Sequence, residues 1–162
     1  MEHKYHKQME MSKNHDDHYK KLLIMAVLSF IAMYILMYSM ANSLANVYPN
    51  INQFYMAGLM TMPMIIIELL LMGKMYSNKK LNISLITICS AGLIAFFLLI
   101  QSQTAVSDKQ FLKGMIPHHA AAILMSEQSK SQDPEIKKLQ LEIILSQQKE
   151  IEVMKAKLES LK

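Results

Sequence analysis

Three apolar runs, each long enough to cross a lipid bilayer, constrain this chain more than any other feature. They cover residues 22–45, 54–76 and 81–100, and a transmembrane helix needs about 20 residues. Because lipid offers no hydrogen bonds to the backbone, a single apolar run crosses as a helix. We therefore expect an all-α protein with a three-helix membrane region at 22–100.

A polar, lysine-rich head, residues 1–21, precedes the first run. The apolar run that follows is too long for a typical cleaved signal, so we interpret it as a retained anchor. The head carries two His-x-x-His pairs, His3 with His6 and His15 with His18. We interpret it as a solvated cytoplasmic tail, and a metal-collecting tail is the alternative.

Lysine placement predicts the orientation in the membrane. The head has five lysines and the second connection has Lys79 and Lys80, with Lys74 nearby, whereas the first connection, 46–53, is uncharged. Lysine-rich segments stay on the cytoplasmic side. We therefore predict a multi-pass protein of the inner (cytoplasmic) membrane, with a cytoplasmic N-terminus and a periplasmic or extracellular C-terminal domain.

The formal net charge of +4 belongs mostly to the predicted cytoplasmic side, because the chain from residue 101 onward has nine lysines against eight acids. This balance does not indicate nucleic-acid binding. The lipid bilayer is the expected partner.

One acid stands inside the second apolar run. Met64, Glu68 and Met72 follow one another at steps of four, which places them along one helix. A bare carboxylate at that depth is costly. We expect Glu68 to be protonated, paired or facing an ion path, and we take Glu68, Met64 and Met72 as a possible intramembrane site. Methionine packing is the alternative for the two thioethers.

The C-terminal residues, 107–162, read as a helical hairpin after a short linker at 101–106. Ser107 matches a capping box that starts one helix, while Asp133 is an N-cap with Pro134 in the first turn of the next helix. A tight turn between them predicts antiparallel helices. Pro117 lacks a backbone N–H, so the first helix should bend or restart there.

Imidazole and thioether groups gather on this hairpin. At about 100° per residue, Met115 and His118 share one face and His119 lies beside them. In the second helix, Gln147, Glu150 and Met154 share one stripe. Counting back from the turn places Ser146 and Gln147 level with the two histidines, and Glu150 level with Met115. Met125 is about 15 Å along the axis from Met115 and cannot share an ion with it, so it is a second site or core. One predicted metal site contains Met115, His118, His119, Glu150 and Met154.

The donor types suggest which ion such a site takes. Imidazole with thioether suits Cu(I), whereas imidazole with carboxylate suits Cu(II) or zinc. Ferritin-type iron sites need Glu-x-x-His motifs, and neither histidine of the pair has an acid three residues earlier. The single cysteine, Cys89, excludes a CxxC site. No nucleophile–base pair or phosphate loop is recognisable, so we predict that the protein is not an enzyme.

The motifs Met-Ile-Pro-His-His at 115–119, Asp-Pro-Glu at 133–135 and Glu-Ile-Glu-Val-Met at 150–154 resemble those of the domain of unknown function 305 family, in its membrane-anchored branch. The resemblance implies an exported, ferritin-like all-helical domain, and some members are linked to copper binding and resistance. Carried over, the family pattern points to Met115, His118, His119, Met125, Gln147, Glu150 and Met154.

Many relatives carry the hairpin motif twice, whereas this chain has it once. Because two helices bury little apolar surface, we expect the hairpins of two protomers to pair as a homodimeric four-helix bundle. The first functional hypothesis is copper capture, buffering or resistance on the exported hairpin, with a copper-handling partner protein. The alternative is a structural or interaction module that mediates oligomerisation or docks to a membrane complex without metal, and transport is a weaker third.

Overall fold

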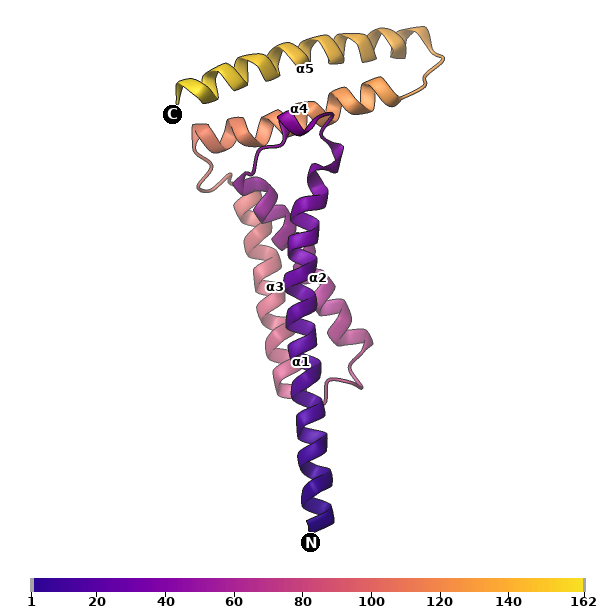
Figure 1. Ribbon diagram of the computed structural model, residues 1–162, viewed down its shortest axis with the longest axis vertical. Coiled ribbons are helices and arrows are strands. Elements are labelled where there is room, and N and C mark those ends of the chain that lie inside the picture. Colours follow the sequence, from indigo (N-terminus) through magenta and orange to yellow (C-terminus); the bar gives the residue numbers. More distant parts are fainter. Residues whose placement is uncertain (1, 162) are drawn as a thin grey trace. The chain divides into compact units, whose positions relative to one another are not determined.

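The computed structural model describes the backbone of residues 2–161 and the side chains of residues 17–161. This part of the chain is entirely helical, which confirms the predicted all-α class (Figure 1). Its elements are α1 (Glu2–Leu36), the short 3₁₀ turns η1 (Met37–Met40) and η2 (Leu44–Asn46), α2 (Ile51–Leu71), α3 (Lys79–Gln101), α4 (Asp108–Gln128) and α5 (Pro134–Ser160).

Three helical stretches are long and apolar enough to cross a membrane, as predicted: Asp17–Met40, Ile51–Leu71 and Lys79–Gln101. The second ends earlier than the predicted residue 76, because a turn closed by Met75 N–H donating to Met72 O follows α2. The backbone of α1 begins at Glu2, so the head is continuous with the first apolar helix and is not an irregular tail. The head's His3, His6 and His15, and with them the metal-collecting alternative, lie outside the described side chains.

The chain divides into two compact units. One contains α1 as far as Met33 together with Tyr55–Ser102, and the other contains Tyr34–Phe54 and the chain from Gln103 onward. The predicted linker lies at this division: Gln103 and Ala105 have φ values of 49° and 60°, the left-handed region, which ends the α3 helix.

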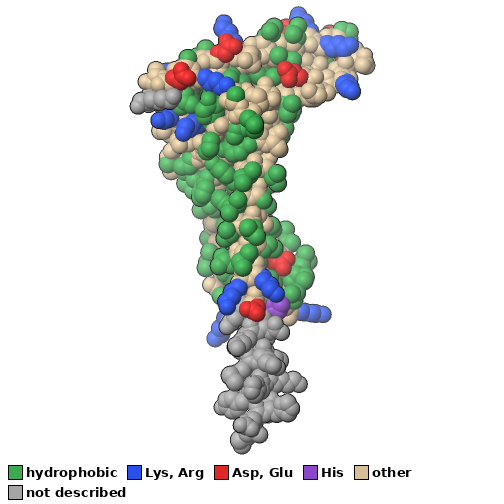
Figure 2. Space-filling model, viewed as in Figure 1, with side chains coloured by type: hydrophobic (Ala, Val, Ile, Leu, Met, Phe, Trp, Pro, Cys, Tyr) green, Lys and Arg blue, Asp and Glu red, His purple; other side chains and the backbone are tan. Residues whose placement is uncertain are grey.

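The first unit packs α1, α2 and α3 around a small core of Leu22, Leu69 and Tyr76. Most of its large apolar side chains point outward, and Figure 2 shows a nearly continuous hydrophobic surface along these helices. At Gly58 of α2, an added Cβ would lie 2.5 Å from Phe96 of α3, so the absence of a side chain permits this close packing.

In the second unit, α4 and α5 lie side by side and run in opposite directions, which confirms the predicted hairpin (Figure 1). Both N-caps form: Ser107 Oγ accepts from Gln110 N–H, and Asp133 accepts from the first turn of α5. The second half of the predicted capping box is not seen, because Gln110 Oε1 accepts from Ile51 N–H instead. The core contains a stripe of α4 at steps of four, four and three with two residues of α5: Leu112, Ile116, Ala120, Ile123, Ile151 and Leu158.

The predicted first span, 22–45, is too long at its end. The chain leaves the α-helix after Leu36, and Ala41 and Tyr48 pack against the hairpin core. Asn50 Nδ2 also lies 3.4 Å from Lys113 O in α4. Residues 37–50 therefore belong to the hairpin unit, because their turns bury side chains on α4.

Candidate metal-binding groove

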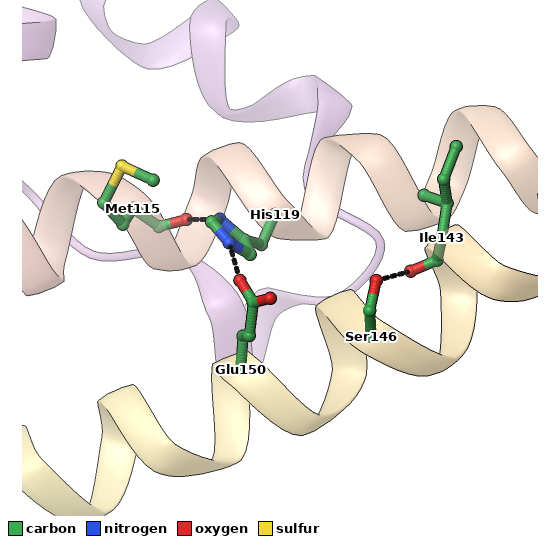
Figure 3. Close-up of polar contacts among 5 residues, drawn as sticks. All are labelled: Met115, His119, Ile143, Ser146 and Glu150. Carbon is green, nitrogen blue, oxygen red and sulfur yellow. Dashed lines mark hydrogen bonds and ion pairs between the residues drawn. The ribbon is translucent and has the colours of Figure 1, made fainter.

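His119 joins the two helices of the hairpin. Its side chain is buried, and its Nε2 atom lies 2.7 Å from Glu150 Oε2 of α5 (Figure 3). On the other side of the ring, Nδ1 lies 2.9 Å from the carbonyl oxygen of Met115, one turn earlier in α4. The ring is thus held between its own helix and α5.

Both partners of His119 are hydrogen-bond acceptors. The Met115 carbonyl can only accept, so it selects the ring form with a proton on Nδ1. The ionised Glu150 carboxylate also only accepts, so a neutral ring cannot donate to both oxygens. The 2.7 Å contact between Nε2 and Oε2 therefore needs one more proton, carried by either atom, or a metal ion in its place.

A groove of about 490 Å³ opens along this contact. It contains polar groups from both helices between apolar walls, and its lining residues are Phe111, Met115, His119, Ser146, Lys149, Glu150, Val153 and Met154. Met115 and Met154 are therefore both lining residues of the groove that holds the imidazole and the carboxylate. Figure 3 shows that the carbonyl of Met115, and not its sulfur, points at the His119 ring.

Of the five residues predicted to share one site, four line this groove: Met115, His119, Glu150 and Met154. His118 does not line it. That residue is exposed, with its ring centroid 6.0 Å from that of His119, because neighbouring positions on a helix differ by about 100°.

Two further residues suggested by the family resemblance lie elsewhere. Met125 is 54% exposed, and it belongs neither to the groove lining nor to the hairpin core. Gln147 is half-buried and does not line the groove either. Ser146 and Lys149 line it instead. The sequence placed both Ser146 and Gln147 level with the histidines, and of these two only Ser146 lines the groove.

Nitrogen and oxygen side chains alone do not form a metal centre in the described part of the chain. No group of three or more His, Cys, Asp or Glu residues is placed there to hold one ion.

The predicted restart of the helix at Pro117 is wrong, because Pro117 lies inside the uninterrupted helix α4. Proline has no N–H to donate to the carbonyl of Lys113, four residues earlier. The buried Asn50 supplies a donor instead, with Nδ2 at 3.4 Å from that oxygen, and Ile51 N–H donates to Gln110 Oε1 at 3.0 Å. The segment before α2 thereby replaces the missing helical donor, which the sequence did not reveal.

In the possible intramembrane site, Glu68 lies beside Tyr76. Tyr76 Oη donates to Glu68 Oε1 at 3.2 Å, so the carboxylate is paired, one of the three predicted alternatives. Burial raises the pKa of Tyr76 above its ordinary value, and the nearby Glu68 charge adds to this shift. Met72 directly follows the last residue of α2, and its N–H still donates to Glu68 O at 2.8 Å, one helical turn earlier.

A sequence model of the family described as "Domain of unknown function (DUF305)" matches residues 98–158. The uncharacterized protein L153 of Acanthamoeba polyphaga mimivirus is 38% identical over 144 residues, which are 87% of this chain and 93% of the viral protein. The chain belongs to the DUF305 family. No solved structure matches it.

The DUF305 match extends from Leu98, in the last turns of α3, to Leu158 in α5, and so contains the whole groove. The 144 residues aligned with the viral protein are too many to fit within this match. The similarity therefore extends into the apolar helices that precede the DUF305 region.

Proposed function

We propose that this DUF305 protein is a membrane-anchored copper-binding protein that captures or buffers Cu(I) on its hairpin and takes part in copper resistance. The observation that supports the proposal is the groove between α4 and α5, where the imidazole of His119 contacts Glu150 and where Met115 and Met154 are lining residues.

The hydrogen bond to Met115 O prepares His119 for a metal ion. With Nδ1–H donating to that carbonyl, the lone pair of Nε2 is directed into the groove toward Glu150. A ligating histidine usually has its other nitrogen fixed in this way. In this proposal, His119 Nε2 and the Glu150 carboxylate would hold Cu(I) in place of the proton that they share, and the thioethers of Met115 and Met154 would complete a soft ligand set.

The flexible side chains of Met115 and Met154 allow this without movement of the helices. Methionine has three rotatable side-chain bonds, so a sulfur on the groove wall can turn toward the ion. Met154 packs partly against the hairpin core, and Met115 is half-buried. Binding would therefore order two side chains and replace one hydrogen bond.

The protein acts, in this proposal, outside the cytoplasmic membrane. The three apolar helices span the bilayer, and the lysines near the start of α3 remain on the cytoplasmic side. Three crossings then export the hairpin to the periplasm or the cell exterior. Copper is cargo here, held without chemical conversion and passed to or from a copper-handling partner.

A competition titration of the purified full-length protein with a chromophoric Cu(I) chelator tests this function. We expect the wild type to bind one Cu(I) per chain, and His119→Ala and Met154→Leu each to bind it roughly tenfold more weakly, the effect of losing about 1.4 kcal/mol. His118→Ala and Met125→Leu are the matched controls, because neither residue lines the groove. Equal losses in these controls, or a wild type no tighter than His119→Ala, would refute the site.

An interaction module remains the second candidate, because α5 also has an apolar surface away from the groove. Leu141 and Leu145 lie one turn apart and are 57% and 63% exposed. Such leucines suit the pairing of two hairpins into a homodimeric four-helix bundle.

The mass of the detergent-solubilised protein distinguishes this second function. We expect a dimer for the wild type and a monomer for Leu145→Glu, since a charge in an apolar interface is costly. A dimer that binds no Cu(I) would favour the interaction module, and a wild-type monomer would exclude it.

A further inference from the structure

A second groove, of about 290 Å³, lies in the unit formed by the three apolar helices. Its walls come from all three helices, and apart from the hydroxyl of Tyr19 its lining is apolar. The lining residues are Tyr19, Leu22, Leu23 and Ala26 of α1, Ile65 of α2, and Leu81, Leu85 and Cys89 of α3.

The groove follows the helices along their length. Leu81, Leu85 and Cys89 succeed one another at steps of four, so they form one stripe about 12 Å long at 1.5 Å per residue. The hydrocarbon core of a bilayer is about 30 Å thick, so the stripe matches most of one leaflet. The groove is open at its sides, since Leu23 remains 65% exposed and Leu81 38% exposed.

Positive charge lies at one end of this apolar lining. Lys20 and Lys21 directly precede Leu22 in α1, and Lys79 and Lys80 directly precede Leu81 in α3. All four lysines are exposed, and Figure 2 shows lysine side chains at this end of the hydrophobic surface, with a few acids among them.

The mouth of the groove is held by polar contacts between helices. Tyr19 Oη donates to Asn82 Oδ1 of α3 at 2.6 Å, and Asn82 Nδ2 donates to Tyr76 O at 2.8 Å. Tyrosine and lysine are the residues that favour the membrane–water interface. The charged end therefore has the composition of a headgroup region, and the apolar stripe has that of an acyl-chain region.

We propose that this groove binds one acyl chain of an anionic glycerophospholipid, with the headgroup phosphate against Lys20, Lys21, Lys79 and Lys80. The charge pattern favours a lipid over a second copy of the chain, because a second copy in parallel orientation would bring the same lysines together and repel. Basic residues at a membrane surface attract anionic lipids. The proposal requires the chain to lie in a bilayer, but it does not require the hairpin to bind metal.

Fluorescence quenching by brominated lipids tests the groove in the full-length protein reconstituted in vesicles. The chain has no tryptophan, so one introduced tryptophan reports a single position. Leu81→Trp places it in the groove, and Ile83→Trp places it at a similar depth on the opposite side of α3, where the side chain is 66% exposed. The vesicles contain phosphatidylcholine with either brominated phosphatidylglycerol or brominated phosphatidylcholine.

We expect quenching of Leu81→Trp to favour the brominated anionic lipid by about fivefold, because about 1 kcal/mol of attraction to the lysines corresponds to that factor. For Ile83→Trp, we expect the same preference to be less than about twofold. Adding Lys79→Gln and Lys80→Gln should remove the preference at Leu81→Trp. Leu23→Trp, on the α1 wall of the groove, should behave as Leu81→Trp does and guards against a local effect of one substitution.

Three results would overturn the proposal. If Leu81→Trp and Ile83→Trp prefer the brominated anionic lipid equally, the groove makes only ordinary contact with lipid. Quenching of Ile83→Trp alone by both lipids means that another helix, such as that of a second copy, fills the groove. If neither variant is quenched, the protein is not inserted in the membrane. This result differs from the one in which the protein is inserted but the groove does not bind the lipid.

Discussion

The contact between His119 and Glu150 predicts a measurable coupling between α4 and α5. Nε2 and Oε2 are 2.7 Å apart, which is the distance of a charge-assisted hydrogen bond. The His119 side chain is 9% exposed and that of Glu150 is 54% exposed. Such a bond is worth about 1.5–3 kcal/mol when shielded, but an exposed pair contributes about 0–1 kcal/mol. With one partner in water, we expect a coupling of about 1 kcal/mol.

A double-mutant cycle isolates this quantity. The variants are His119→Leu, which keeps an apolar volume in the buried position, Glu150→Ala and the two combined. Hydrogen exchange of the hairpin amides in the metal-free, detergent-solubilised protein measures the local opening free energy of α4 and α5. The exposed pair Lys138 and Glu142, 3.9 Å apart on α5, serves as control and should couple by no more than about 0.5 kcal/mol.

The same experiment bears on the proposed copper site. At a free Cu(I) concentration of 100 times the wild-type dissociation constant, the opening free energy should rise by about 2.7 kcal/mol in the wild type and by only about 1.4 kcal/mol in His119→Leu, if that variant binds Cu(I) about tenfold more weakly. A coupling indistinguishable from that of the control pair would refute the reasoning about the hydrogen bond. Equal protection of His119→Leu by copper would place the ion elsewhere.

Three other perturbations have expected outcomes. Gly58→Ala brings a Cβ within 2.5–2.7 Å of three ring atoms of Phe96, so we expect a loss of about 1–3 kcal/mol by overpacking; thermal unfolding in detergent measures it, and Phe96→Leu should restore most of it. Ile116→Ala empties a position of α4 that is 0% exposed and should cost about 2–5 kcal/mol, seen as faster hydrogen exchange throughout the hairpin. Burial and Glu68 raise the pKa of Tyr76, so the folded state holds this proton above pH of about 10, where the unfolded chain releases it. Stability should then fall as pH rises beyond that value, and Tyr76→Phe should flatten this part of a melting-temperature profile.

Much of the architecture follows from local properties of the sequence. The third apolar run was predicted at 81–100 and forms α3, Lys79–Gln101. The helices α4 and α5 begin directly after Ser107 and Asp133, because the side-chain oxygens of these residues accept hydrogen bonds from N–H groups of the first turn. These features depend on residues within a turn of one another, so a reading of the chain alone recovers them.

The ends of the first two spans could not be predicted in the same way. Residues 37–46 include Asn42, Ser43 and Asn46 among their apolar residues, and there the chain forms 3₁₀ turns while Ala41 packs against the hairpin core. After Leu71 the chain turns, and Tyr76 packs in the core beside Leu69. In both places, side-chain burial against a distant segment outweighs local helix propensity.

The candidate site shows the same division. The sequence alone determined that imidazole, carboxylate and thioether groups occur at helical spacing on two neighbouring helices, because composition and periodicity belong to the chain itself. The tertiary structure decided that His119, and not His118, faces Glu150, and that Tyr76 pairs with Glu68. Adjacent residues on a helix differ by only about 100°, so the packing of α4 on α5 selects which of two equivalent side chains enters the groove.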